Sequence, residues 1–150
     1  MKRIILFLII LALAFPLVAD QFTDEFYDYV NEVRARKDLT VLDISEPTEK
    51  VADTYSRIIA EEGEIDHSAL SKFEFSRLCY NYGLKNIYMR EILLSCPKEC
   101  TPWDVFELFY ESPDHRAAII DPDGRFIGAG YSIKNGMMYF TAYVIIPKGD

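Results

Sequence analysis

The sequence predicts an α+β domain, with its helices placed ahead of a small and mainly antiparallel sheet. Apolar side chains recur at helical spacing in residues 22–36 and again between residues 45 and 63. Beyond residue 124 the apolar spacing becomes strand-like, and Asn135-Gly136 divides this part into two segments, as the turn of a hairpin does. Helices segregated from antiparallel strands are typical of the α+β class.

Four helices are expected, and three of them begin at residues that commonly cap helices. The first covers residues 22–36. The second starts near Ser45 and ends at Gly63, the third follows Thr101, and the fourth opens at Ser112, whose hydroxyl is expected to cap it. The buried face of the third helix is predicted to consist of Trp103, Phe106, Phe109 and Tyr110.

Three strands are expected after the second helix. The first covers residues 87–94, which are mainly apolar and are followed by a cysteine-proline break. The other two cover residues 126–133 and 137–146, where β-branched and aromatic side chains dominate. Asn135-Gly136 suits the two positive φ angles of a type I′ turn between them. Residues 121–124 read Asp-Pro-Asp-Gly and predict a turn before the hairpin.

The N-terminus is predicted to be a targeting segment that takes no part in the fold. Two basic residues precede an unbroken apolar run over residues 4–15, and the small Ala19 precedes the expected cleavage point. Residues 1–19 are therefore predicted to be a secretory signal peptide, and residues 20–150 a single domain. The alternative is an uncleaved membrane anchor, although the run is shorter than the ~20 residues of a spanning helix. We expect a secreted, extracellular or cell-envelope protein that meets a membrane only through an uncleaved signal segment.

Composition limits the possible partners. The chain has 150 residues, half of them hydrophobic, and its 16 basic and 24 acidic residues give a net charge of −8. A chain of this length fits one core, and the apolar content excludes intrinsic disorder. The acidic balance argues against nucleic acid as a partner, because phosphate binding requires a basic face.

Export changes what the three cysteines are expected to do. In an oxidising compartment a cysteine pair is expected to form a disulfide. Because Cys96 and Cys100 are close in sequence with Pro97 between them, we expect Cys79 to pair with one of the two, which leaves one thiol free. A zinc site at Cys96 and Cys100 is disfavoured, since no second cysteine pair or nearby histidine completes a tetrahedron.

Four motifs along the chain carry a resemblance to a known family. They are Asn31-Glu32-Val33-Arg34, Asp66-His67-Ser68, Ser112-Pro113-Asp114-His115-Arg116 and Ile127-Gly128-Ala129-Gly130-Tyr131. Each is weak alone, but in this order and spacing they resemble the CAP superfamily of cysteine-rich secretory proteins, antigen 5 and pathogenesis-related 1 proteins, in its shorter prokaryotic SCP form. The resemblance covers nearly all of the chain after the predicted signal peptide.

The resemblance implies a three-layer α-β-α sandwich with a cleft where two histidines and acidic residues meet. His67 and His115 match the two histidine positions, and Glu91 matches the glutamate of the family's Gly-Glu-Asn segment, although Arg and Ile flank it here. Ser112 stands where longer members have a second glutamate, with Glu111 beside it. The predicted cleft therefore holds His67, Glu91, His115 and Ser112.

Two neutral imidazoles and a carboxylate are suitable ligands for zinc or another divalent cation. His67, His115 and Glu91 are therefore the predicted metal ligands, with positions left open for water. The predicted function is that of an extracellular binding or interaction module, whose ligand is a lipid, a small molecule or a protein.

The alternative is a metal-dependent hydrolase, a peptidase or esterase, in the same cleft. Its catalytic residues are unknown, and Glu91 is the candidate general base for a metal-activated water. A mechanism with a serine nucleophile at Ser68 or Ser112 is a further alternative, but the chain lacks the sequence motifs of the common hydrolase nucleophiles and metalloproteases.

Overall fold

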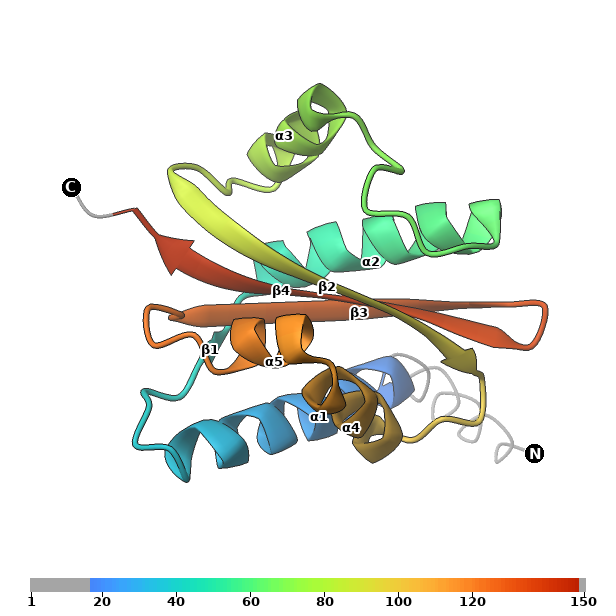
Figure 1. Ribbon diagram of the computed structural model, residues 1–150. Coiled ribbons are helices and arrows are strands. Elements are labelled where there is room, and N and C mark those ends of the chain that lie inside the picture. Colours follow the sequence, from blue (N-terminus) through green and yellow to red (C-terminus); the bar gives the residue numbers. More distant parts are fainter. Residues whose placement is uncertain (1–16, 149–150) are drawn as a thin grey trace, which may run out of the picture.

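The computed structural model describes residues 17–148, in which helices cover both faces of one sheet (Figure 1). One face carries α1 (Leu17–Ala35), α4 (Pro102–Glu111) and α5 (Pro113–Ile119). The other face carries α2 (Glu46–Glu62) and α3 (Lys72–Asn81). The predicted α+β class and the three-layer sandwich are both confirmed.

The sheet is mixed, with the strand order β1-β3-β4-β2. Its strands are β1 (Asp43–Ile44), β2 (Ile87–Pro97), β3 (Phe126–Lys134) and β4 (Met137–Pro147). The two-residue β1 pairs in parallel with β3, and the other pairings are antiparallel. The three predicted strands and the hairpin are confirmed, with positive φ angles of 52° at Asn135 and 78° at Gly136. The sequence did not predict β1, because two residues are too short to show a period.

Side-chain alternation along the strands produces two cores, one on each face of the sheet. On β4, Phe140 and Val144 face α1, α4 and α5, whereas Tyr143 and Ile145 face α2 and α3. Both sets are at most 2% exposed. The sheet is therefore buried on both sides, and an edge strand such as β2 is where a cleft can open to solvent.

The helix ends follow the sequence, with one exception. Ser45 caps α2 by accepting from the Thr48 N–H, and Gly63 ends it in the left-handed region with φ of 81°. Ser112 precedes α5 as predicted, but its hydroxyl makes no capping hydrogen bond. Ser112 also follows the last residue of α4, and at this shared position its backbone carbonyl accepts the Arg116 N–H at 2.8 Å.

Two further predictions about helices need correction, and one helix was not predicted. The first helix begins at Leu17, five residues before the predicted start. The aromatic face of α4 is only partly buried, because Trp103 at its first turn is 45% exposed and lies edge-on to Tyr29. The helix α3 was not predicted, although Ser71 and Glu74 form a complete capping box at its start.

The targeting prediction lies almost wholly outside the described residues, because residues 1–16 are not among them. Within residues 17–148, no helix combines the length and the apolar character needed to cross a membrane.

The predicted disulfide between Cys79 and Cys96 or Cys100 is wrong, and all three cysteines are free thiols. Cys79 lies on the buried face of α3, with its Sγ 3.7 Å from the Sδ of Met89. Cys96 is seven residues beyond Met89 on β2, roughly 23 Å along the strand at ~3.3 Å per residue. A disulfide spans at most about 7 Å between Cα atoms. Cys100 is instead the neighbour of Cys96, whose pKa is raised to about 12 by burial and then by Cys100.

The Ile-Gly-Ala-Gly motif allows α2 to lie directly on β3. A Cβ added at Gly128 would stand 2.6 Å from the backbone nitrogen of Glu49, and one at Gly130 would stand 2.5 Å from that of Asp53. Real Cβ atoms do not approach backbone this closely, so any larger residue would push the helix off the sheet. The two glycines are therefore required for packing.

The Asn-Glu-Val-Arg motif fastens α1 to the rest of its layer. The amide of Asn31 exchanges two hydrogen bonds with the backbone of Leu42, at 2.8 and 3.0 Å. Arg34 is fully buried and donates to the carbonyl oxygens of Thr40, Ile119 and Asp121 at 2.8 to 2.9 Å. This guanidinium joins the loop after α1 to the end of α5 and to the turn that follows it.

We predict that Arg34→Lys destabilises the fold by about 2–4 kcal/mol, because one ammonium group cannot reach three carbonyl oxygens that are arranged around a planar guanidinium. The measurement is the free energy of unfolding in urea. Arg36→Lys is the matched control, since the Arg36 side chain is 72% exposed in the turn just after α1 and we expect a change below about 0.5 kcal/mol there. Equal losses in the two variants would contradict the structural role of Arg34.

Candidate binding cleft

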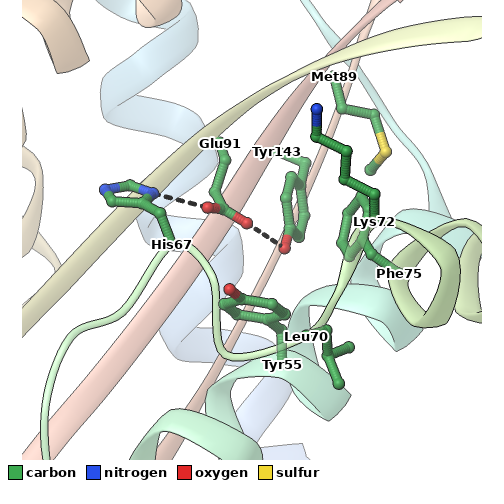
Figure 2. A pocket seen from close by; sticks show the side chains of 8 residues that line it. All are labelled: Tyr55, His67, Leu70, Lys72, Phe75, Met89, Glu91 and Tyr143. Carbon is green, nitrogen blue, oxygen red and sulfur yellow. Dashed lines mark hydrogen bonds and ion pairs between the residues drawn. The ribbon is translucent and has the colours of Figure 1, made fainter.

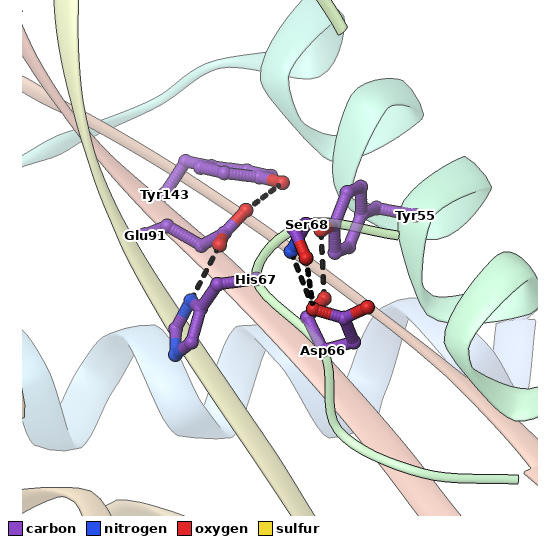
Figure 3. Close-up of polar contacts among 6 residues, drawn as sticks. All are labelled: Tyr55, Asp66, His67, Ser68, Glu91 and Tyr143. Carbon is purple, nitrogen blue, oxygen red and sulfur yellow. Dashed lines mark hydrogen bonds and ion pairs between the residues drawn. The ribbon is translucent and has the colours of Figure 1, made fainter. Parts of the chain in front are cut away.

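The loop between α2 and α3 presents His67 over the edge strand β2. The buried Tyr55 of α2 donates its hydroxyl to the backbone oxygen of Asp66 at 2.8 Å. The Asp66 carboxylate accepts from the backbone N–H of Ser68 at 2.7 Å and from its hydroxyl at 2.6 Å (Figure 3). These contacts hold both residues that flank His67.

Glu91 is the centre of the polar contacts in this cleft. One carboxylate oxygen lies 2.7 Å from Nδ1 of His67, and the other accepts from the Tyr143 hydroxyl at 2.7 Å (Figure 2). Glu91 and Tyr143 are direct partners across the β2–β4 ladder, so the sheet register brings them together. The Glu91 side chain is 20% exposed and that of His67 is 60% exposed, which places His67 at the mouth of the cleft.

The two tyrosines of the cleft act as hydrogen-bond donors at neutral pH. Burial, followed by the charge on Glu91, raises the pKa of Tyr55 to about 12. The same two causes raise the pKa of Tyr143 well above its ordinary value. Both phenols therefore keep their protons, and Tyr143 supplies a fixed donor to the carboxylate of Glu91.

A pocket of about 230 Å³ lies next to this polar cluster. Eight side chains line it: Tyr55, His67, Leu70, Lys72, Phe75, Met89, Glu91 and Tyr143 (Figure 2). Leu70, Phe75 and Met89 provide apolar wall, whereas Glu91 and His67 provide hydrogen-bonding groups at one end. The pocket therefore combines an apolar surface with the polar pair His67 and Glu91 at one end, and the cationic Lys72 also lines it.

His115 lies in the other layer of the fold and is not among the residues that line the pocket. It lies in α5, on the face of the sheet opposite Tyr143, and its ring is edge-on to Phe109 at 5.3 Å between centroids. Burial lowers the pKa of His115, the charge on His67 lowers it further, and Asp114 opposes both.

The predicted site residues are thus only partly brought together. His67 and Glu91 are in contact, but among residues 17–148 no three His, Cys, Asp or Glu side chains are arranged to hold a metal ion. Nδ1 of His67 instead contacts one oxygen of Glu91 directly. The metal and the catalytic role of Glu91 stay predictions.

The two serines considered as nucleophiles have other places in the structure. Ser68 donates its hydroxyl to Asp66. Ser112 is half-buried at the junction of α4 and α5 and is not among the residues that line the pocket. The sequence analysis missed Tyr143 and Lys72 as cleft residues, since only the strand register and α3 bring them there.

Comparisons with known proteins agree with the four motifs. The family model described as "Cysteine-rich secretory protein family", or CAP, matches residues 27–145. No curated protein matches the chain in sequence.

Solved structures share the fold at low sequence identity. An outer surface protein from Borrelia burgdorferi is similar with a TM-score of 0.72 and 23% identity, over 85% of this chain and 94% of that one. An extracellular SCP-domain protein from Bacillus anthracis has a TM-score of 0.67 and 15% identity, over 87% of this chain and 45% of its own. A cysteine-rich secretory protein from Staphylococcus aureus has a TM-score of 0.65 and 13% identity, over 87% and 40%. This chain spans less than half of the latter two proteins.

We predict that His115 titrates below the ordinary histidine value of 6.5 in chelator-treated protein. His67→Gln should raise the pKa of His115, because a neighbouring positive charge is removed, whereas Asp114→Asn should lower it further. The measurement is the NMR chemical shift of the His115 ring protons as a function of pH. Because the folded state disfavours the protonated ring, stability should begin to fall as pH drops below about 6.5 and should continue to fall until pH passes the lowered pKa of His115. A change of the His115 pKa in the same direction in both variants would contradict the proposed electrostatics.

Proposed function

Because this chain belongs to the cysteine-rich secretory protein family, or CAP family, we propose that it is an extracellular binding module. Its ligand enters the pocket beside Glu91 and Tyr143. Structural relatives described as outer surface, extracellular or secretory proteins support the extracellular part of the proposal. The apolar run and basic start of residues 1–19 support export in the same way.

The pocket is the observation that carries the proposal. Its wall combines the aliphatic and thioether side chains of Leu70 and Met89 with the ring of Phe75, and its polar end is the His67–Glu91 pair. Ligand sites in proteins commonly join an apolar lining to a few fixed polar groups. Tyr143 holds the Glu91 carboxylate in place, so the polar end is already oriented before a ligand arrives.

The size and chemistry of the pocket restrict the ligand. About 230 Å³ is below the roughly 300 Å³ at which typical small-molecule sites begin. The pocket therefore fits a small molecule or one end of a larger one, such as the end of a lipid chain. Glu91 accepts hydrogen bonds, and His67 at the mouth can donate one, so the bound group should carry a hydroxyl, amine or amide.

We predict that a library of small amphipathic fragments, observed by ligand-detected NMR, yields binders that Leu70→Trp removes. The indole would fill much of the pocket, because Leu70 lines it directly. Leu108→Trp is the matched control, since Leu108 is 44% exposed on α4 and outside the pocket. Fragments that bind all three proteins equally would place binding elsewhere, and an absence of binders would contradict the proposal.

The three-ligand cation site is a separate proposal, which we test by calorimetric titration of zinc into chelator-treated protein. If His67, Glu91 and His115 all ligate zinc, His67→Ala and His115→Ala should each weaken affinity by roughly tenfold or more. Gln21→Ala is a control, because its exposed amide donates to Glu25 on α1, and neither residue is a predicted ligand. Unchanged affinity in His115→Ala would contradict a three-ligand site and would agree with the two-residue contact between His67 and Glu91.

A further inference from the structure

The outer face of α3 exposes aromatic rings that the fold does not bury. Phe73 and Tyr80 are 74% and 62% exposed, and Phe73 has the largest exposed fraction of the bulky apolar side chains in residues 17–148. Arg77 lies between them, so that the three residues follow the i, i+4, i+7 spacing of one helix face. The opposite face of α3 packs on the body of the protein through Cys79 and Leu78. The exposed rings are therefore no part of the core.

Each exposed ring has a cation against it. The guanidinium carbon of Arg77 lies 5.9 Å from the centroid of Phe73, and Nζ of Lys85 lies 4.4 Å from that of Tyr80. We call Phe73, Arg77, Tyr80 and Lys85 the basic-aromatic face. Cation–π contacts at exposed positions are weak, so both cations are free to move toward a stronger anionic partner.

The charge of this region is opposite to that of the protein as a whole. Residues 71–85 hold three of the 16 basic residues but only one of the 24 acidic ones, Glu74. The Glu74 carboxylate is engaged in the capping box with Ser71. In Figure 1, α3 lies at the outer end of the molecule, beyond α2 and away from α1, α4 and α5. A basic surface is thus presented outward by an otherwise acidic protein.

We propose that the basic-aromatic face binds the surface of an anionic lipid bilayer. Arg77 and Lys85 match lipid phosphates in charge, and the exposed rings match the boundary between headgroups and acyl chains. The exposed ring of Phe73 favours a bilayer over a soluble polyanion as the partner. A ring without polar atoms gains little free energy from contact with phosphate or sulfate, but it gains free energy by leaving water. This surface is distinct from the proposed ligand pocket, which none of its four residues lines.

The test is cosedimentation of the full chain with phosphatidylcholine vesicles that contain phosphatidylglycerol, compared with pure phosphatidylcholine vesicles. The apolar run in residues 4–15 would bind both kinds of vesicle, so the result is the difference between them. We expect tighter binding to the anionic vesicles, weakened by salt. Arg77→Gln and Lys85→Gln should each lower the anionic preference roughly fivefold. Phe73→Ser should weaken binding to the anionic vesicles by a similar factor.

A second aromatic-cation pair provides a matched control. Tyr88 is 60% exposed, with Nζ of Lys148 4.5 Å from its ring centroid. Its side chain alternates with that of Met89, which packs under α3, so Tyr88 points to the other face of the sheet. Tyr88→Ser and Lys148→Gln should leave vesicle binding unchanged. The substituted positions lie in α3, just after it, at the exposed start of β2 or, for Lys148, just after β4. Urea unfolding checks that each variant is folded.

Three results would overturn the proposal. Equal binding to anionic and neutral vesicles would exclude a role for the basic residues. Equal effects of Tyr88→Ser and Phe73→Ser would exclude the particular face. Binding to heparin that depends on Arg77 and Lys85, together with vesicle binding that does not depend on Phe73, would assign the face to an anionic polymer.

A spectroscopic experiment reports on Phe73 directly. In the Trp103→Phe background, Phe73→Trp places the single tryptophan of the chain on the basic-aromatic face. We expect its emission to move to shorter wavelength with anionic vesicles and to stay in place with heparin, because only the bilayer takes the ring out of water. Unchanged emission with vesicles would contradict insertion.

Discussion

The buried guanidinium of Arg34 is the interaction on which one whole layer of this fold depends. A charged group without water must find hydrogen-bond partners within the protein, and Arg34 finds three backbone carbonyls from three different segments. Those segments are the loop after α1, the end of α5 and the following turn. The three hydrogen bonds of Nε and Nη1 therefore fix the relative positions of α1 and α5, and with them the placement of His115.

Asp121 links the buried Arg34 to the strand that carries Glu91. Its backbone oxygen accepts from Arg34, while its carboxylate binds the Nε of Arg90 at 2.5 Å on β2. Arg90 precedes Glu91, and alternation along the strand turns the two side chains to opposite faces of the sheet. Arg90 thus holds β2 from one side while Glu91 meets Tyr143 on the other. The cleft opens at this edge strand, where β2 pairs only with β4.

Local chemistry made much of the fold predictable. Ser45 and Gly63 delimit α2, and Asn135-Gly136 forms the hairpin, because caps and tight turns are decided by neighbouring residues. The disulfide prediction needed distances between segments remote in sequence. The pairing of Cys79 with Cys96 assumed a proximity that the length of β2 excludes, and the missed helix α3 lacks a strongly apolar face although its capping box was readable.

By itself, the sequence determined the α+β class, most element boundaries and the family, because these follow from local spacing and from motifs whose residues are fixed by packing, as Gly128 and Gly130 are. It also singled out His67, Glu91 and His115. Only the tertiary structure decided which of them meet. Contact between His67 and Glu91, and the donation from Tyr143, depend on the register of β2 against β4 and on the loop held by Tyr55. Register and loop position arise from packing across the whole sheet, which no local pattern contains.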